Sequence, residues 1–344
     1  MERFKVVVAG CGGMSYTWVD YALTRKDVEI AGLMDINIEN AKRLADKFHL
    51  TCGIYNDLAE AIEATGANLV FDVTIPEAHR DTMIKAMGLG CYVLGEKPMA
   101  SSMEEAREMV MEANRQGRMY AVMQNRRYNK HIRALKGLIG SGAIGKPGFI
   151  CADFFLGPHF GGFREIMDSP LILDMAIHTF DQARFISGAD PVSVYCHEFN
   201  PSGSWYKGDA SAVCIFEMSD GSVFCYRGSW CSKGVPTAWE SSWRIMGSDG
   251  TAVWDGTNEP FAETAISKEI GSFFDNTVRV EPSYEWNGKE GHHGCLDEMF
   301  DALIEGRKSA TDCTDNIKSM AMVFGALMSS RSGTKIDVTE LYNI

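Results

Sequence analysis

Residues 5–15 have the sequence Lys-Val-Val-Val-Ala-Gly-Cys-Gly-Gly-Met-Ser, and this stretch decides the fold class of the chain. Its β-branched beginning, residues 5–9, predicts a short buried strand. Gly10 permits a tight turn after that strand, and Gly12 lets a phosphate group approach the main chain. Residues 15–24 predict a helix whose first N–H groups and positive dipole end attract anions. A strand, a glycine loop and a helix in this order favour a dinucleotide site over a plain turn.

The alternation of strands and helices continues beyond this loop to about residue 123. Further strands are predicted at residues 28–34, 69–74, 91–94 and 119–123, and further helices at 37–48, 57–65, 77–89 and 102–116. Repeated β-α-β units with short connections predict a parallel, doubly wound sheet. We therefore predict an α/β chain whose residues 1–124 form an N-terminal Rossmann domain.

The pattern changes near Asn125, where long strand-like stretches replace the alternation. Strands are predicted at residues 149–155, 192–198, 210–218, 222–229, 239–246 and 251–254, and helices at 131–140, 173–187, 295–305 and 315–329. We predict a C-terminal α+β domain over residues 125–344, with an open, mostly antiparallel sheet for substrate binding and oligomerisation. Because such a sheet leaves one face uncovered, we expect a homodimer or homotetramer.

The composition excludes several classes of partner. The 344 residues carry a formal net charge of −13, so the surface repels nucleic-acid phosphates and anionic lipids. Ten cysteines form no Cys-x-x-Cys pair and mostly lie in apolar runs, which is typical of reduced thiols in a cytoplasmic protein. No apolar run approaches the length that spans a bilayer. We expect a small-molecule ligand, no nucleic-acid or membrane partner, and no metal.

Asp35 ends the second predicted strand and bears on the choice of cofactor. An acid at this position accepts hydrogen bonds from an adenosine ribose and repels a 2′-phosphate. The next residues are Ile36 and Asn37, so no arginine directly follows to bind such a phosphate. This pattern favours NAD over NADP. The alternative is an aspartate that merely caps a helix, which we rank below ribose binding because the glycine loop is present.

Two further motifs carry groups suited to acid–base chemistry. Glu96-Lys97-Pro98 follows a predicted strand, where Lys97 could assist proton transfer or be a surface lysine held by Glu96; chemistry alone does not choose. Asp174 and His178 have the spacing of one helix face, which suits a general base with its orienting carboxylate. The pair could also ligate a metal or be an exposed helix pair. Asp181 is a second candidate partner for His178.

These motifs together resemble the Gfo/Idh/MocA family of oxidoreductases. The resemblance covers nearly the whole chain and rests on Gly10–Ser15, Asp35, Thr74-Ile-Pro76 with His79, Glu96-Lys97-Pro98, Arg126-Arg127-Tyr128 and Asp174–His178. Ser15, where the fingerprint has glycine or alanine, is the main departure. The family implies NAD(P)-dependent oxidation or reduction of a sugar, cyclitol or related polyol.

The resemblance also implies roles for individual residues. It assigns Lys97, Asp174 and His178 as the catalytic set, which would also contact substrate. Its cofactor contacts are Gly10, Gly12, Gly13, Met14, Asp35, Thr74, Pro76, Glu96, Lys97 and Asn125. In this scheme His178 takes the hydroxyl proton, Asp174 orients the imidazole, and Lys97 steadies the alkoxide while hydride moves to NAD⁺.

Several expectations come from weaker signals, and rival functions stay open. Arg164, in a glycine-rich stretch, is a candidate substrate contact, whereas His292 and His293 are expected to lie in a solvated turn. The rivals are transient oxidation by NAD that permits glycosidic cleavage or elimination, a non-catalytic NAD(H)-binding regulator, and a metal-dependent enzyme. The sequence leaves open the particular sugar, the carbon oxidised and the direction of reaction.

Overall fold

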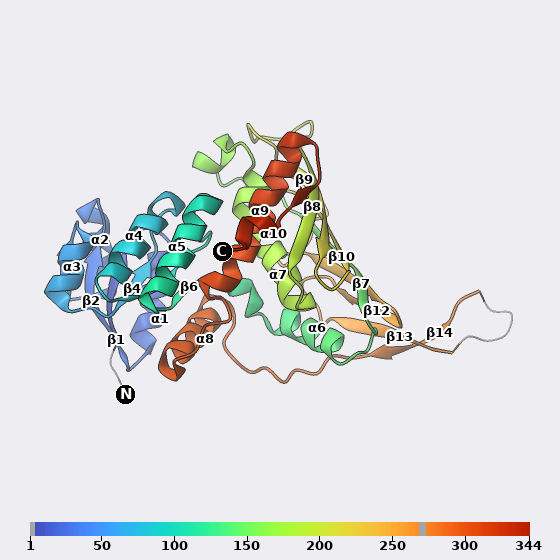
Figure 1. The fold of residues 1–344 in the computed structure, drawn as a ribbon, viewed down its shortest axis with the longest axis horizontal. Helices are drawn as coiled ribbons and strands as arrows, with labels where there is room; N and C mark the ends of the chain where they lie inside the picture. Colours follow the sequence, from blue (N-terminus) through green and yellow to red (C-terminus); the bar gives the residue numbers. More distant parts are fainter. Residues whose placement is uncertain (1–3, 268–272) are drawn as a thin grey trace. The chain divides into compact units, whose positions relative to one another are not determined.

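The computed structural model describes residues 4–267 and 273–344, which pack into two compact units (Figure 1). The first unit comprises residues 1–125, 289–320 and 344, and the second comprises residues 126–288 and 321–343. Residues 289–320 therefore join the first unit although they follow the second unit's sheet along the chain.

The first unit is built on a six-stranded parallel sheet with the strand order β3-β2-β1-β4-β5-β6. Its strands are β1 (Phe4–Ala9), β2 (Val28–Met34), β3 (Gly53–Tyr55), β4 (Leu69–Asp72), β5 (Tyr92–Gly95) and β6 (Tyr120–Val122). The order reverses direction at β1, so the carboxyl end of β1 lies at the point where a doubly wound sheet binds its ligand. The three-residue strand β3 escaped the sequence analysis because it is too short to show a period.

The helices of this unit are α1 (Ser15–Thr24), α2 (Ile38–Phe48), α3 (Leu58–Thr65), α4 (Pro76–Gly88), α5 (Met103–Gln116) and α8 (Gly291–Glu305). Side chains cap the N-termini of α2, α3 and α5. Asp57 caps α3 by accepting from the Glu60 N–H at 3.0 Å, and Ser102 caps α5 in the same way. Helix α8 packs on β1 and α1 through Phe300, whose ring lies 5.2 Å from that of Phe4.

The second unit is built on a nine-stranded sheet with the order β14-β13-β12-β11-β7-β10-β9-β8-β15. The strands are β7 (Pro147–Phe155), β8 (Pro191–Phe199), β9 (Ser211–Met218), β10 (Val223–Ser229), β11 (Ser242–Gly247), β12 (Gly250–Trp254), β13 (Phe261–Ser267), β14 (Asn276–Val280) and β15 (Ile336–Asp337). Strands β7 and β10 pair in parallel and the other neighbours pair antiparallel. This confirms the mostly antiparallel sheet, although the sequence analysis missed β13, β14 and β15.

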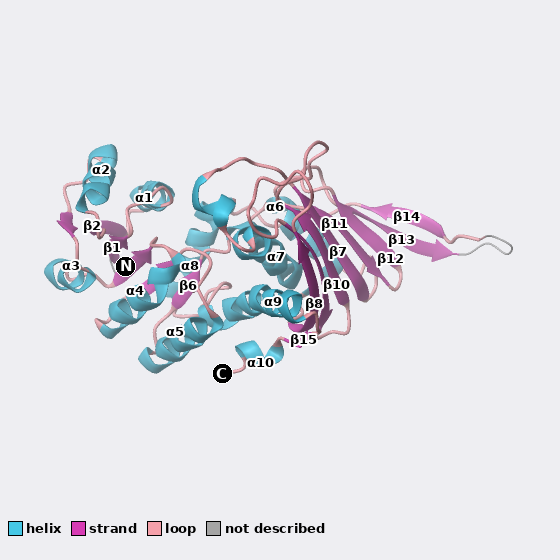
Figure 2. Ribbon diagram, turned by 90° about the horizontal axis from the view of Figure 1, so that it is seen from above, coloured by secondary structure: helices cyan, strands magenta, loops and turns pink. Residues whose placement is uncertain are grey.

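One face of this sheet is covered and the other is not. The helices on the covered face are α6 (Lys130–Gly140), α7 (Ile177–Ser187) and the later part of α9 (Cys313–Ser332), seen on one side in Figure 2. Alternate residues such as Phe216, Phe224 and Ile245 are fully buried beneath them. The short helix α10 (Thr339–Tyr342) follows β15. On the opposite face, Tyr195 and Ile215 lie directly across from each other, and each is about half exposed.

The cysteines and the lengths of the helices can be compared with the sequence-based expectations. All ten cysteines lie in the described part of the chain and are free thiols there. In the same residues, no helix combines the length and the apolar character that crossing a membrane requires.

Candidate functional site

The glycine loop turns sharply at Gly10 and leaves space beside Gly12 and Gly13. Gly10 has a φ of +84°, and a Cβ atom on it would meet the Val73 carbonyl oxygen at 2.5 Å, so only glycine fits. Added Cβ atoms on Gly12 and Gly13 would meet nothing within 4 Å, which leaves room beside the main chain. Met14 precedes α1, and no acidic side chain occupies the first turn of that helix. The N-terminus of α1 is thus open to an anion.

Ser15 fits this loop despite its departure from the family pattern. Its side chain is fully buried, and its hydroxyl donates to the Gly12 carbonyl at 2.6 Å. The hydroxyl therefore has a partner within the loop and adds a bond that glycine or alanine could not make. The phosphate-binding geometry is compatible with serine at this position.

Asp35 is tied to the glycine loop and is not a simple helix cap. One carboxylate oxygen accepts from the Cys11 main-chain N–H at 2.8 Å, and the other accepts from the Asn37 N–H at 2.8 Å. The N-cap of α2 is Asn37 itself, whose side chain accepts from the Glu39 N–H. Burial, with a smaller effect of Asp35, raises the pKa of the Cys11 thiol to about 12, so that thiol stays protonated. Asp35 thus links the end of β2 to the loop after β1.

Thr74 and Pro76 follow β4 in a segment organised by a buried acid. The Thr74 hydroxyl donates to Asp72 at 2.5 Å, and Pro76 opens α4. The His79 Nδ1 lies 2.9 Å from the other Asp72 oxygen, and both side chains are fully buried. Although burial opposes it, the charge of Asp72 raises the pKa of His79. The sequence analysis overlooked Asp72, but a charged residue inside the apolar run 69–73 was the signal available.

Glu96 and Lys97 follow β5, one strand beyond β4 in the sheet. The Glu96 carboxylate is nearly buried and accepts from the Trp18 Nε1 at 2.7 Å and from the Lys97 main-chain N–H at 3.2 Å. The Lys97 side chain is half-buried, and its bond to Pro98 is cis. Glu96 is therefore held by an α1 tryptophan and by the backbone.

Asn125 and His292 meet near the end of β6. The Asn125 amide lies 3.4 Å from the His292 Nδ1, and the His292 Nε2 lies 3.7 Å from a Glu96 oxygen. His292 and His293 are the second and third residues of α8, so the solvated turn expected from the sequence is wrong. The glycines at 291 and 294 misled that prediction, because the helix passes through Gly294.

In the second unit, Asp174 lies in a π-helix that the sequence analysis did not foresee. Residues Leu171–Ala176 form this π-turn, and α7 continues from Ile177. Such wide turns often occur at functional sites. The Asp174 carboxylate accepts from the Arg164 Nε at 2.7 Å, and Arg164 lies over the Phe163 ring at 4.7 Å. The structure thus joins a predicted substrate contact to a predicted catalytic carboxylate.

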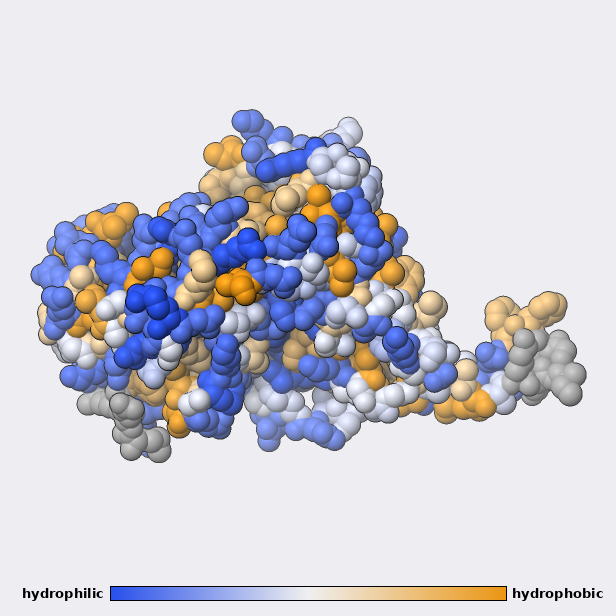
Figure 3. Space-filling model, viewed as in Figure 1, coloured by the Kyte–Doolittle hydropathy of each residue, from blue (hydrophilic) through white to orange (hydrophobic). Residues whose placement is uncertain are grey.

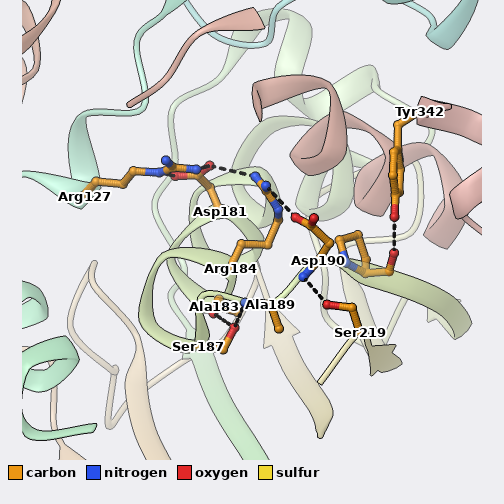
Figure 4. Close-up of polar contacts among 10 residues, drawn as sticks. Arg127, Asp181, Ala183, Arg184, Ser187, Ala189, Asp190, Ser219 and Tyr342 are labelled. Carbon is orange, nitrogen blue, oxygen red and sulfur yellow. Dashed lines mark hydrogen bonds and ion pairs between the residues drawn. The ribbon is translucent and has the colours of Figure 1, made fainter. Parts of the chain in front are cut away.

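His178 is the second residue of α7 and is 7% exposed. Asp181, three residues further on, accepts two bonds of 2.6 Å from the Arg127 guanidinium (Figure 4). Arg184 bonds Asp190 at 3.0 Å and lies 4.0 Å from Asp181 in the same network. This buried chain of charges anchors α7 and gives Asp181 a structural partner.

A cavity of about 500 Å³ opens in the second unit, at β7 and β10–β14. Its lining includes Arg227, paired with Asp153 at 2.5 Å, and Arg279, paired with Glu281 at 2.5 Å. The lining includes none of the residues predicted to bind cofactor or substrate. Among the described residues, no cluster of three histidine, cysteine or acidic side chains could hold a metal ion.

Comparison with known proteins identifies the class of this chain. A model of the oxidoreductase family with an NAD-binding Rossmann fold matches residues 4–124, and the GFO/IDH/MocA C-terminal domain matches residues 132–253. The N-terminal part is an NAD-binding Rossmann domain of an oxidoreductase. The chain belongs to the Gfo/Idh/MocA family, which confirms the resemblance drawn from its motifs.

Individual relatives include proteins named as sugar and inositol dehydrogenases. The chain is 25% identical to a D-apiose dehydrogenase of Rhizobium rhizogenes over 98% of both proteins. It is 29% identical to an inositol 2-dehydrogenase/D-chiro-inositol 3-dehydrogenase of Lacticaseibacillus casei over 55% of both. An Agrobacterium radiobacter oxidoreductase, solved with NAD⁺, L-tartaric acid and magnesium, superposes with a TM-score of 0.84. It is 24% identical and covers 98% of this chain and 99% of its own, which shows a shared fold.

Proposed function

We propose that this protein transfers hydride between NAD(H) and a secondary alcohol or ketone of a sugar, cyclitol or related polyol. The observation that carries the proposal is the division of polar groups between the units. The first unit holds a glycine loop hydrogen-bonded to Asp35. The second holds Asp174, on the turn before His178, paired with Arg164. The sugar and inositol dehydrogenases among the relatives support this substrate class.

The residues of the first unit fit NAD(H). The proposal places the pyrophosphate against Gly12, Gly13 and the start of α1, where the structure leaves space. It places the adenosine ribose at Asp35, whose negative charge would repel the 2′-phosphate of NADP. Thr74, Pro76, Glu96 and Asn125 follow β4, β5 and β6, and are assigned to the nicotinamide half. When bound, NAD⁺ supplies the hydride acceptor.

The remaining residues handle the proton and the substrate. We assign His178 as the general base that takes the hydroxyl proton, because histidine is the side chain most often used for this task. Asp174 orients the imidazole, and Lys97 donates to the oxygen that gains charge. The Arg164 Nε–H donates to Asp174, and in this proposal other N–H groups of the guanidinium donate to substrate hydroxyls.

A binding titration followed by a substrate panel tests the proposal. Purified protein is titrated with NADH and with NADPH while nicotinamide fluorescence is followed, and acid release from a separate sample, read by absorbance, shows whether cofactor is already bound. We expect tight NADH binding, weaker NADPH binding, and NAD⁺ reduction by at least one sugar or cyclitol of the panel. Absence of NADH binding to cofactor-free protein would overturn the proposal. Cleavage of a glycoside without net NADH production would instead support transient oxidation.

We also propose that the protein is a homodimer or homotetramer. The uncovered sheet face exposes Phe149, Tyr195, Ile215 and Met246, and the hairpin of β13 and β14 carries apolar groups near its end (Figure 3). Apolar side chains gathered this way support assembly through the second unit. Light scattering after gel filtration should show a mass of at least twice that of one chain, and Ile215→Lys should lower it. A monomeric wild-type protein would contradict this.

A further inference from the structure

His292 joins two residues that the proposed function assigns to the nicotinamide half. It lies on α8, whereas Glu96 follows β5 and Asn125 follows β6, the neighbouring strand. One imidazole thus spans the carboxyl ends of two adjacent strands, with Nδ1 3.4 Å from the Asn125 Nδ2 and Nε2 3.7 Å from a Glu96 oxygen. Residues about 170–200 positions apart along the chain meet at this point.

The contacts of His292 suit one tautomer. With the Asn125 Nδ2 as donor, the His292 Nδ1 accepts and the imidazole proton is carried by Nε2, which faces the Glu96 carboxylate. Burial lowers the pKa of His292, and His293 and Lys97 lower it further, whereas Glu96 opposes the shift. The positive end of the α8 dipole also lowers the pKa of His292. A neutral imidazole that accepts on one side and donates on the other is the form consistent with these surroundings.

Glu96 is constrained from three elements. Trp18 of α1 donates to one oxygen at 2.7 Å, the Lys97 main-chain N–H donates to the other at 3.2 Å, and His292 of α8 faces the first. The strand order puts β5 and β6 on the opposite side of β1 from β2, which carries Asp35. A dinucleotide with its adenosine at β2 therefore extends its nicotinamide toward β5 and β6.

We propose that His292 is a positioning residue of the cofactor site, holding Glu96 and Asn125 in place for the nicotinamide riboside. This inference rests on the proposed function, because it assumes that NAD(H) binds across these strand ends. His292 acts through the two side chains and takes no part in the proton transfer assigned to His178. Removing the imidazole should therefore weaken binding of the nicotinamide half and leave the adenosine half unaffected.

The chain offers a matched control one residue away. His293 lies on the same helix turn, with its Nε2 3.8 Å from Asp20 and its ring 5.3 Å from that of Tyr21. Its contacts are with residues of α1 that the cofactor proposal does not use. His293→Ala therefore removes a histidine from the same helix terminus without disturbing Glu96 or Asn125.

The test measures the affinities of NADH and ADP for wild type, His292→Ala, His292→Gln, His292→Asn and His293→Ala, with a melting temperature for each. ADP carries the adenosine and pyrophosphate but no nicotinamide riboside. We expect His292→Ala to weaken NADH binding about tenfold and to change ADP binding less than about twofold. Glutamine can keep the donor toward Glu96 and asparagine can keep the acceptor toward Asn125, so each should restore part of the loss. His293→Ala should bind both ligands like wild type.

Three outcomes would overturn the inference. Unchanged NADH affinity in His292→Ala would show that the imidazole positions nothing. Equal losses of NADH and ADP affinity would show a general structural role. Either of these results refutes only this inference if the wild type binds NADH, whereas the third outcome, cofactor-free wild type that binds neither ligand, refutes the proposed function as well.

Discussion

The two units present their polar groups in different ways. In the parallel sheet, the groups lie on loops after the strands, and main-chain N–H groups help to hold the acids Asp35 and Glu96. In the mixed sheet, Asp174 and His178 lie on a π-turn and helix, held by side-chain pairs such as Arg164 with Asp174. Substitutions in the glycine loop change the path of the main chain, whereas substitutions of Asp174 or His178 remove one side chain at a time. The comparison predicts that cofactor binding and chemistry can be lost separately.

The largest separation is expected for His178→Ala. Loss of a general base lowers kcat by about 10²–10⁴-fold, while NADH affinity should stay within about twofold of wild type. Steady-state kinetics at saturating substrate and a fluorescence titration measure the two effects. His197→Ala, which removes an exposed histidine of β8, serves as the control. Equal kcat values for His178→Ala and wild type would remove His178 from the mechanism.

Two glycine substitutions test separately whether the loop is needed for folding and for cofactor binding. Gly10→Ala should destabilise the first unit by about 1–3 kcal/mol, because φ is positive and the Cβ would overlap the Val73 carbonyl. Gly12→Ala should leave the melting temperature nearly unchanged and weaken NADH binding, because its Cβ enters the open space beside the loop. Thermal unfolding and NADH titration of both variants check this. Gly12→Ala with wild-type NADH affinity would show that no phosphate lies there.

Asp35→Ala tests whether the acid selects the cofactor. It should weaken NADH binding by about 1.5–3 kcal/mol, the range for hydrogen bonds to a charged group, and should narrow the gap between NADH and NADPH. Parallel titrations with the two cofactors give the ratio. An unaltered preference for NADH, together with a lower melting temperature, would mean that Asp35 serves only to hold the Cys11 loop.

The smallest effect concerns stability alone. Burial raises the pKa of Glu198 from 4.5 to about 7, so the folded protein binds more protons than the unfolded chain between these pH values. The free energy of unfolding therefore falls as pH rises through this interval. Glu198→Gln should remove that part of the pH dependence and stabilise the protein at pH 8 by about 1 kcal/mol. Urea unfolding at pH 5 and pH 8 measures it, and an identical slope in both proteins would contradict it.

Much of the first unit could be predicted because its elements are local. The β-branched strands, the helix starts near Asp57 and Ser102, and the glycine loop each follow from residues within one turn or strand. Strands with weak sequence patterns were not predicted, because β3 has only three residues, and β13 and β14 lack a clear apolar alternation. The cofactor and substrate residues stay predictions, since binding and kinetics decide them.

The sequence by itself determined the fold class, the family, and the order of the strands and helices up to residue 123 apart from the short strand β3. Only the tertiary structure decided that α8 joins the first unit, that His292 lies against Glu96 and Asn125, and that Asp181 pairs with Arg127. The physical reason is the distance along the chain over which the deciding interactions act. Periodicity and capping depend on neighbours along the chain, whereas a buried polar side chain takes whatever partner the packed elements bring to it, and that partner can come from any distance in the sequence.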